Sequence, residues 1–131
     1  MANQSFKNLT VYKKAFELAM AIFNTSKRFP KEEKYSLTDQ IRRSSRSVAV
    51  CIAEAYRKRN YEAYFVSKSS DGDMENSETQ VWLNFALACE YITTEEFDGL
   101  LGASEEVGKL LNHMIENPEK YLTTKQKAEA G

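Results

Sequence analysis

The side chains most able to do chemistry are few and lie far apart in the sequence. His113 is the sole histidine, and the two cysteines, Cys51 and Cys89, do not form a Cys-x-x-Cys pair. A di-iron bundle needs Glu-x-x-His motifs on facing helices, but Leu110 stands three positions before the histidine. A serine or cysteine nucleophile needs a base that an acidic group orients, and the sequence shows no such group for His113. We therefore expect no catalytic residue, no metal site, no cofactor and no enzymatic activity.

Two carboxylates and several cations remain as candidates. Glu54 and Glu78 could share a site as acid and base, but structural hydrogen bonding is the simpler interpretation. No glycine-rich phosphate loop is present. Nucleic acid is the stronger alternative, because phosphate contacts need only a basic surface and nearby tyrosines can stack on unpaired bases. The candidate contacts with nucleic acid or a protein partner are Arg42, Arg46, Arg57, Lys58 and Arg59, close in sequence to Tyr56, Tyr61 and Tyr64.

Charge is distributed unevenly along the chain. Residues 1–70 hold 14 Lys and Arg against 6 Asp and Glu, a net charge of +8, while residues 71–131 hold 4 against 13, a net charge of −9. Either the two halves neutralise each other within one molecule, or the basic surface of one copy meets the acidic surface of another. The second arrangement joins two different patches and can close into a ring. The pI of 5.9 lies well below the value of about 9 that is typical of strong nucleic-acid binders.

Composition favours one small helical domain. A chain of 131 residues with two prolines and five glycines has few helix breakers and suits a single core. No apolar run approaches the ~20 residues that span a bilayer, and the N-terminus lacks the apolar core of a signal peptide. The isolated cysteines are typical of a reducing compartment. We expect a cytoplasmic protein without a membrane partner.

Apolar residues recur at steps of three and four in four segments, which predicts four amphipathic helices. The first runs from Leu9 to about Arg28, with Phe16 on its apolar stripe, and Pro30 ends it. The second opens at Ser36, whose hydroxyl could cap it, and fades at residues 57–60.

The third segment, capped by Asn60, extends to about Tyr91 with Phe85 on its stripe, but it has a polar middle, residues 67–78. We expect a continuous helix in which Gly72 serves packing; the alternative is a loop between two shorter helices. Thr93 and Glu96 predict a capping box at the start of the fourth segment, which ends before Pro118.

Four such helices with short links predict an all-α fold, an antiparallel up-down-up-down four-helix bundle over residues 1–117 with a flexible tail at 118–131. Folding back near Asn60 places Ser47 opposite Gly72 and Arg43 opposite residues 76–78, as a buried charged pair whose disruption would cost about 3–5 kcal/mol. Small residues would then permit close approach of the two helices. The predicted polar seam consists of Gln40, Arg43, Ser47, Gly72 and Glu78.

Three stretches carry a resemblance to a known family: "FKNLTVYKKAFELA", "FPKEEKYSLTDQIRRSSRSV" followed by "IAEA", and "SETQVWLNFALACEYI". In order and spacing, residues 6–117 resemble the four-helix bundle proteins of the 23S rRNA intervening-sequence family. The chain departs from the family pattern at Ala49, Cys51 and Ala55, where proline, asparagine and glycine are common.

The resemblance implies a homo-oligomer, often a five-fold ring, with no established enzymatic activity. Related bundles include the accessory protein of diversity-generating retroelements, which partners a reverse transcriptase. We therefore expect self-association into a pentameric ring and a binding or scaffold role in a ribonucleoprotein setting. RNA, or a protein that processes nucleic acid, is the expected further partner, and direct RNA binding through the basic surface is the alternative function.

Overall fold

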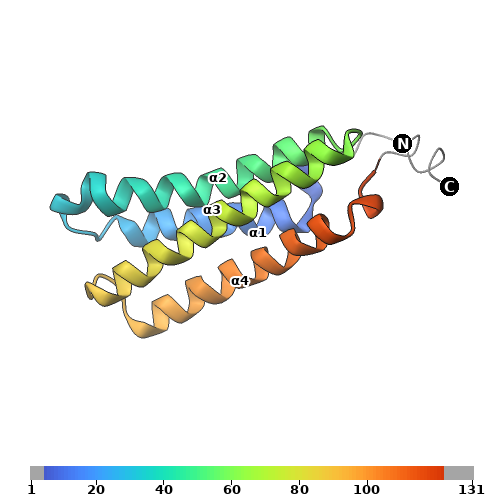
Figure 1. The fold of residues 1–131 in the computed structure, drawn as a ribbon. Coiled ribbons are helices and arrows are strands. Elements are labelled where there is room, and N and C mark those ends of the chain that lie inside the picture. Colours follow the sequence, from blue (N-terminus) through green and yellow to red (C-terminus); the bar gives the residue numbers. More distant parts are fainter. Residues whose placement is uncertain (1–4, 123–131) are drawn as a thin grey trace.

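The computed structural model describes residues 5–122, which form an all-helical bundle without a strand in that range (Figure 1). None of the helices in these residues has a stretch long and apolar enough to cross a lipid bilayer. The predicted all-α fold is therefore confirmed. The four long helices are α1 (Thr10–Ser26), α2 (Asp39–Arg57), α3 (Glu62–Ala88) and α4 (Thr94–Glu116).

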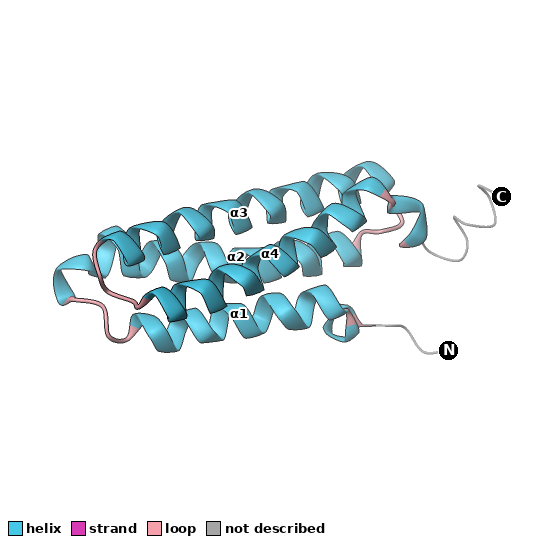
Figure 2. Ribbon diagram, turned by 90° about the horizontal axis from the view of Figure 1, so that it is seen from below, coloured by secondary structure: helices cyan, strands magenta, loops and turns pink. Residues whose placement is uncertain are grey.

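Successive helices run antiparallel and lie side by side (Figures 1 and 2). Lys68 near the start of α3 forms an ion pair with Glu54 near the end of α2, and Glu78 further along α3 pairs with Arg43 near the start of α2, so these two helices run in opposite directions. α1 and α3 each contact both α2 and α4, so α1 and α3 occupy opposite corners of the bundle. The contacts of α3 with α4 show the same antiparallel direction, because Gly72 lies near Leu111 and Asn76 binds Ser104. α1 also runs antiparallel to α4, because Lys14 pairs with Glu106 and Arg28 pairs with Glu96.

The helix ends match the sequence prediction in part. Thr93 and Glu96 form the predicted capping box at the start of α4. The predicted cap at Ser36 is wrong, because this hydroxyl donates to the Glu33 carboxylate within the turns that precede α2, and the residues Lys34–Thr38 already form a π-helical turn. Tyr61, rather than Asn60, occupies the N-cap position of α3.

The polar middle of the third segment is helical throughout, so the alternative of a loop between two shorter helices is wrong. Its buried polar side chains are all hydrogen-bonded: Thr79 and Asn76 bind side chains of α2 and α4, and the Ser69 hydroxyl donates to the Phe65 carbonyl of its own helix. Ser69, Gly72, Asn76 and Thr79 all lie on the buried side of α3. A side chain that competes for backbone hydrogen bonds in an isolated helix loses that disadvantage when a neighbouring helix supplies its partner.

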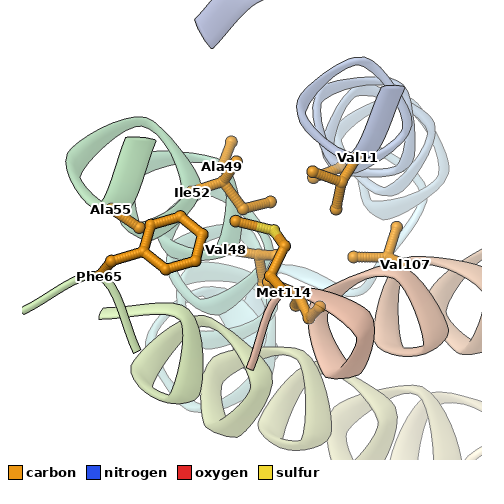
Figure 3. Packing of buried hydrophobic residues seen from close by; sticks show 10 residues of the cluster. Val11, Val48, Ala49, Ile52, Ala55, Phe65, Val107 and Met114 are labelled. Atoms are coloured by element: carbon orange, nitrogen blue, oxygen red, sulfur yellow. The ribbon is translucent and has the colours of Figure 1, made fainter. Parts of the chain in front are cut away.

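The apolar core is divided into two clusters. One cluster lies toward the end of the bundle that holds the turn between α2 and α3, and Figure 3 shows Phe65 and Met114 packed against residues of α2. The other lies toward the opposite end, which holds the turn between α3 and α4, and includes Ile22, Ile41 and Leu83. Each cluster draws on all four helices, so burial of apolar surface holds both ends of the bundle closed.

A buried polar layer separates the two clusters. Ser44 Oγ and Thr79 Oγ1 lie 2.8 Å apart and join α2 to α3. The amide of Asn76 donates to the Ser104 carbonyl at 2.9 Å and accepts from the Ser104 hydroxyl at 2.9 Å, joining α3 to α4. Gln80 Nε2 donates to the same hydroxyl at 2.9 Å. Every buried side-chain nitrogen and oxygen in the described residues has a hydrogen-bond partner, so the layer avoids the cost of an unsatisfied buried group.

The start of the predicted flexible tail packs on the bundle. Residues Pro118–Lys120 form a 3-10 turn, and the Tyr121 ring stacks on Phe65 with ring centroids 5.4 Å apart. Burial raises the pKa of the Tyr121 hydroxyl. Residues 123–131, for which flexibility was also predicted, lie outside the described residues.

Gly72 should tolerate a larger side chain less well than Gly102 of α4. A Cβ there would lie 3.3 Å from the Cys51 Cβ and 3.6 Å from Leu111 Cδ2, whereas one at Gly102 would meet nothing within 4 Å. We expect Gly72→Val to lower the free energy of unfolding by about 1–3 kcal/mol through overpacking. Gly102→Val should lower it by less than about 0.5 kcal/mol or raise it, because valine favours a helix over glycine. Urea unfolding followed by circular dichroism measures both, and equal losses would contradict the close approach at Gly72.

Candidate interaction surfaces

The predicted seam between α2 and α3 contains an exposed ion pair. Arg43 Nη2 lies 2.5 Å from Glu78 Oε2 and 3.3 Å from Glu75 Oε1. The hydrogen bonds to Glu75 and Glu78 raise the pKa of the guanidinium. The Arg43 side chain is 49% exposed, so the prediction of a buried charged pair is wrong. Because water screens such a pair, its contribution to stability is about 1 kcal/mol or less.

The remaining seam residues are placed differently from one another. Gly72 is buried at the crossing of α2 and α3, but it faces Cys51 rather than Ser47, one helical turn away from the predicted position. Gln40 and Ser47 are half-buried, and neither side chain takes part in the hydrogen bonds that join α2 to α3 in the described residues. Ser44 makes that hydrogen bond instead. Its position on the apolar stripe of the second segment was the signal in the sequence.

Two of the candidate contact residues, together with one further cation, surround an aromatic ring. The guanidinium carbons of Arg42 and Arg46 lie 4.8 Å and 5.6 Å from the centroid of the Phe23 ring, and Lys27 Nζ lies 4.8 Å from it. Arg42 is further held by a hydrogen bond of 2.7 Å from its Nε to the Ser26 hydroxyl. We call these three cations around Phe23 the Phe23 cation cluster. Cation–π contacts hold the guanidiniums flat while leaving N–H groups free to bind an anion.

The other three candidate contacts gather at the C-terminal end of α2. Arg59 lies 4.0 Å from the Tyr56 ring centroid and donates to the Tyr56 carbonyl, and Lys58 lies 5.5 Å from the Tyr61 ring centroid. Arg57 is exposed. Arg57 lies eleven positions after Arg46, or about 16 Å along a helix, so the structure forms two basic groups rather than one continuous surface. Of the three nearby tyrosines, Tyr61 and Tyr64 are exposed and Tyr56 is buried in the core.

Part of the charge asymmetry is neutralised within the molecule. Ion pairs join Lys14 to Glu106 at 3.1 Å, Arg28 to Glu96, and Arg43 to its two carboxylates, so basic residues of the first half meet acidic residues of the second. Within residues 5–122, these pairs do not include Arg42, Arg46, Arg57, Lys58 or Arg59. The candidate contacts therefore keep their positive charge available to another molecule.

Two groups of exposed apolar side chains lie on different sides of the bundle. The first, which we call the α1–α2 face, consists of Phe16, Met20 and Val50, and Phe16 and Val50 are 50% and 54% exposed. Phe16 was predicted to lie in the core, but it points away from the side of α1 that Ala15 and Ile22 bury.

The second group, which we call the α3 face, consists of Met74, Val81 and Phe85, with Met74 70% exposed. Phe85, which was also placed on a core stripe in the sequence analysis, is exposed as well. Valine and methionine at positions off the core stripe, as at Val50, Met74 and Val81, were the signal for both faces. Exposed apolar patches of this kind commonly mark interaction sites.

Four of the side chains considered for catalysis are buried, hydrogen-bonded or ion-paired, whereas Cys89 is an exposed free thiol. His113 Nδ1 forms a hydrogen bond of 2.8 Å with the Tyr121 hydroxyl. Burial raises the pKa of the Cys51 thiol, which makes it a poor nucleophile. Glu54 lies 3.2 Å from Lys68, and Glu78 binds Arg43, so these two carboxylates do not share a site. Within residues 5–122, no three His, Cys, Asp or Glu side chains gather as metal ligands would.

The seam should depend more on its buried neutral hydrogen bond than on its ion pair. We expect Thr79→Val to lower the free energy of unfolding by about 1–3 kcal/mol, because it removes the α3 partner of the buried Ser44 hydroxyl and leaves it only the Ile41 carbonyl, 3.3 Å away on its own helix. Arg43→Ala should cost about 1 kcal/mol or less, and less still at high salt. Urea unfolding at low and high salt compares the two. A larger loss for Arg43→Ala would show that the exposed pair, and not the polar layer, joins α2 to α3.

Comparison with known proteins agrees with the fold. The sequence pattern of the family described as 23S rRNA-intervening sequence protein matches residues 7–113. A crystal structure of a protein of unknown function from the S23 ribosomal protein family of Bacteroides thetaiotaomicron VPI-5482 is similar, with a TM-score of 0.73 and 34% sequence identity. The match covers 81% of this chain and 98% of that chain. No curated protein matches significantly.

Proposed function

The chain belongs to the 23S rRNA-intervening sequence protein family, and from this premise we propose that it is a non-enzymatic protein that assembles with copies of itself and acts as a binding scaffold. The observation that carries the proposal is the pair of exposed apolar faces. The core of the bundle is already closed, so Phe16, Val50, Met74 and Phe85 add nothing to it. Their exposure has a physical reason if other molecules cover them.

A closed ring of five copies in a cytoplasmic ribonucleoprotein is the form of assembly that we propose. Two faces on different sides let each copy bind two neighbours, and such contacts close under cyclic symmetry. A ring would also repeat the Phe23 cation cluster once per copy along one rim. A repeated basic rim suits a partner with many phosphates, such as RNA or a protein–RNA complex.

Direct binding of RNA is the second candidate function. The observation that favours it is that Arg46, Arg57 and Lys58 are exposed cations outside the ion pairs of the described residues. The exposed rings of Tyr61 and Tyr64 begin α3 next to the second basic group. Unpaired bases stack on such rings while cations contact the backbone.

Self-association predicts a mass several times that of one chain. Light scattering coupled to size exclusion should give about five times the 15.0 kDa of the chain for the pentameric ring. The mass should hold over a range of protein concentrations, because a closed ring has no free faces to add or lose copies. A mass of 15.0 kDa at every concentration would contradict the scaffold proposal.

Direct RNA binding predicts a strong dependence on salt. Retention of a structured RNA on filters should fall steeply as salt rises, because each phosphate contact releases a counterion. Replacing Arg46 and Arg57 together by glutamine should weaken binding and lower the salt slope by about 2, one for each lost phosphate contact. Lys109→Gln, at an exposed position of α4, is the matched control and should bind as the unmodified chain does. Undetectable retention at low salt would exclude this second candidate.

A further inference from the structure

We propose that the Phe23 cation cluster is an anion-binding site whose ligand is a phosphate monoester, carried by the end of an RNA chain or by a small sugar phosphate. The site goes beyond the proposed function, because it needs neither self-association nor contacts along the backbone of RNA. What it binds is a single terminal phosphate with nearly two negative charges at neutral pH.

Arg42 is held in place from two sides. Its Nε donates at 2.7 Å to the hydroxyl of Ser26, which is 2% exposed and itself donates to the Phe23 carbonyl at 3.0 Å. Its guanidinium carbon lies 4.8 Å from the centroid of the Phe23 ring. A buried serine and an aromatic ring thus fix this guanidinium before a ligand arrives, so binding does not have to order the side chain.

The remaining donors of the cluster have no acceptor in the protein. Within residues 5–122, the Nη hydrogens of Arg42 make no hydrogen bond, and neither do the side-chain nitrogens of Arg46 and Lys27. Asp39, one turn before Arg42 on α2, is not within ion-pair distance of any of the three cations. Because Lys27 and Arg46 are exposed and Arg42 is half-buried, a ligand reaches these donors from solvent.

The three positive charges repel one another and gain from a bound anion. Each lies within 5.6 Å of the same ring centroid, so any two of them lie within about 10 Å, close to the Debye length in physiological salt. The C-terminal end of α1 attracts one cation, which accounts for Lys27 at its C-cap. Arg42, by contrast, lies in the first turn of α2, where the helix dipole disfavours positive charge. An anion offsets both the repulsion and the position of Arg42.

The number and type of the cations select a phosphate monoester among anions. A carboxylate, or a phosphodiester link of RNA, carries one negative charge, whereas a monoester carries nearly two and has three terminal acceptor oxygens. A fixed guanidinium such as that of Arg42 binds two oxygens of one phosphate at once. The ammonium of Lys27 and the guanidinium of Arg46 remain for the other oxygen and the second charge.

Fluorescence anisotropy with short RNA probes tests the class of ligand. The probes are 3′-labelled single-stranded hexauridylates that differ only at the 5′ end, which carries a phosphate, a methyl phosphate diester or a hydroxyl. The unmodified chain should bind the 5′-phosphate probe about tenfold more tightly than the methyl diester probe, the effect of one charge-assisted hydrogen bond. Equal affinity for all three probes would show binding along the backbone, which supports direct RNA binding as a function but overturns the monoester site.

Variants of the cluster test where the phosphate binds. Arg42→Gln should remove most of the tenfold preference, whereas Lys109→Gln, the matched loss of one charge at an exposed position of α4, should keep it. Ser26→Ala leaves every charge in place but removes the acceptor of Arg42 Nε. It should lower the preference to about threefold, half of the effect on the free-energy scale. A preference that survives both Arg42→Gln and Ser26→Ala would overturn the site.

Three controls complete the test. Displacement of the 5′-phosphate probe by millimolar ribose 5-phosphate would identify a small phosphate ester as sufficient, and its failure to displace would identify the RNA end; either result upholds the site. Circular dichroism verifies folding, and if Arg42→Gln unfolds, Lys27→Gln at an exposed position replaces it with the same expectation. If Arg42→Gln lowers the mass by light scattering but keeps the preference, the cluster binds another copy of the chain and the site is overturned. A monomeric unmodified chain that prefers the 5′-phosphate probe would contradict only the proposed self-association.

Discussion

The buried polar layer is the constraint on which the rest of the structure depends. Apolar clusters alone tolerate sliding of one helix along another, because hydrophobic contact has no preferred direction. Hydrogen bonds between Ser44 and Thr79, and between Asn76 and Ser104, oppose such sliding. A shift by one turn would break both contacts and leave the buried Asn76 amide without its partner, while Ser44 and Thr79 would keep only bonds to carbonyls of their own helices. The layer therefore sets the register of α2, α3 and α4. A single polar position in a helical interface is known to specify register at some cost in stability.

Register in turn decides what lies at the surface. With α2 and α3 set by the polar layer, Gly72 meets Cys51 at close approach and Arg43 reaches Glu75 and Glu78 on the exposed edge. The same register turns Met74 and Phe85 outward. The charged seam is thus a consequence of the fold more than a cause of it, and the apolar α3 face is held in place by hydrogen bonds on the opposite side of its own helix.

Helical periodicity was sufficient to predict the four helices, the capping box at Thr93 and the contact of Arg43 with Glu78, because each depends on local spacing or on simple antiparallel pairing. It could not predict that Gly72 faces Cys51, since pairing about Asn60 leaves an uncertainty of one turn that only the buried side chains resolve. Phe16 and Phe85 were misplaced in the core because hydrophobic periodicity does not show whether a neighbouring helix covers each residue of the stripe. The polar layer was visible in the sequence only through Ser44 and Ser104, which interrupt the apolar stripes of the second and fourth segments.

Hydrogen bonds in the buried layer fix the bundle, and the apolar faces that they orient are exposed. The claim that the polar layer sets the register is tested most directly by a double-mutant cycle on Asn76→Ala and Ser104→Ala, with unfolding free energies measured in urea. A coupling energy of about 1 kcal/mol or more is predicted, because the two side chains are hydrogen-bonded in a buried site. Additive losses, with a coupling energy near zero, would contradict the claim that the polar layer sets the register.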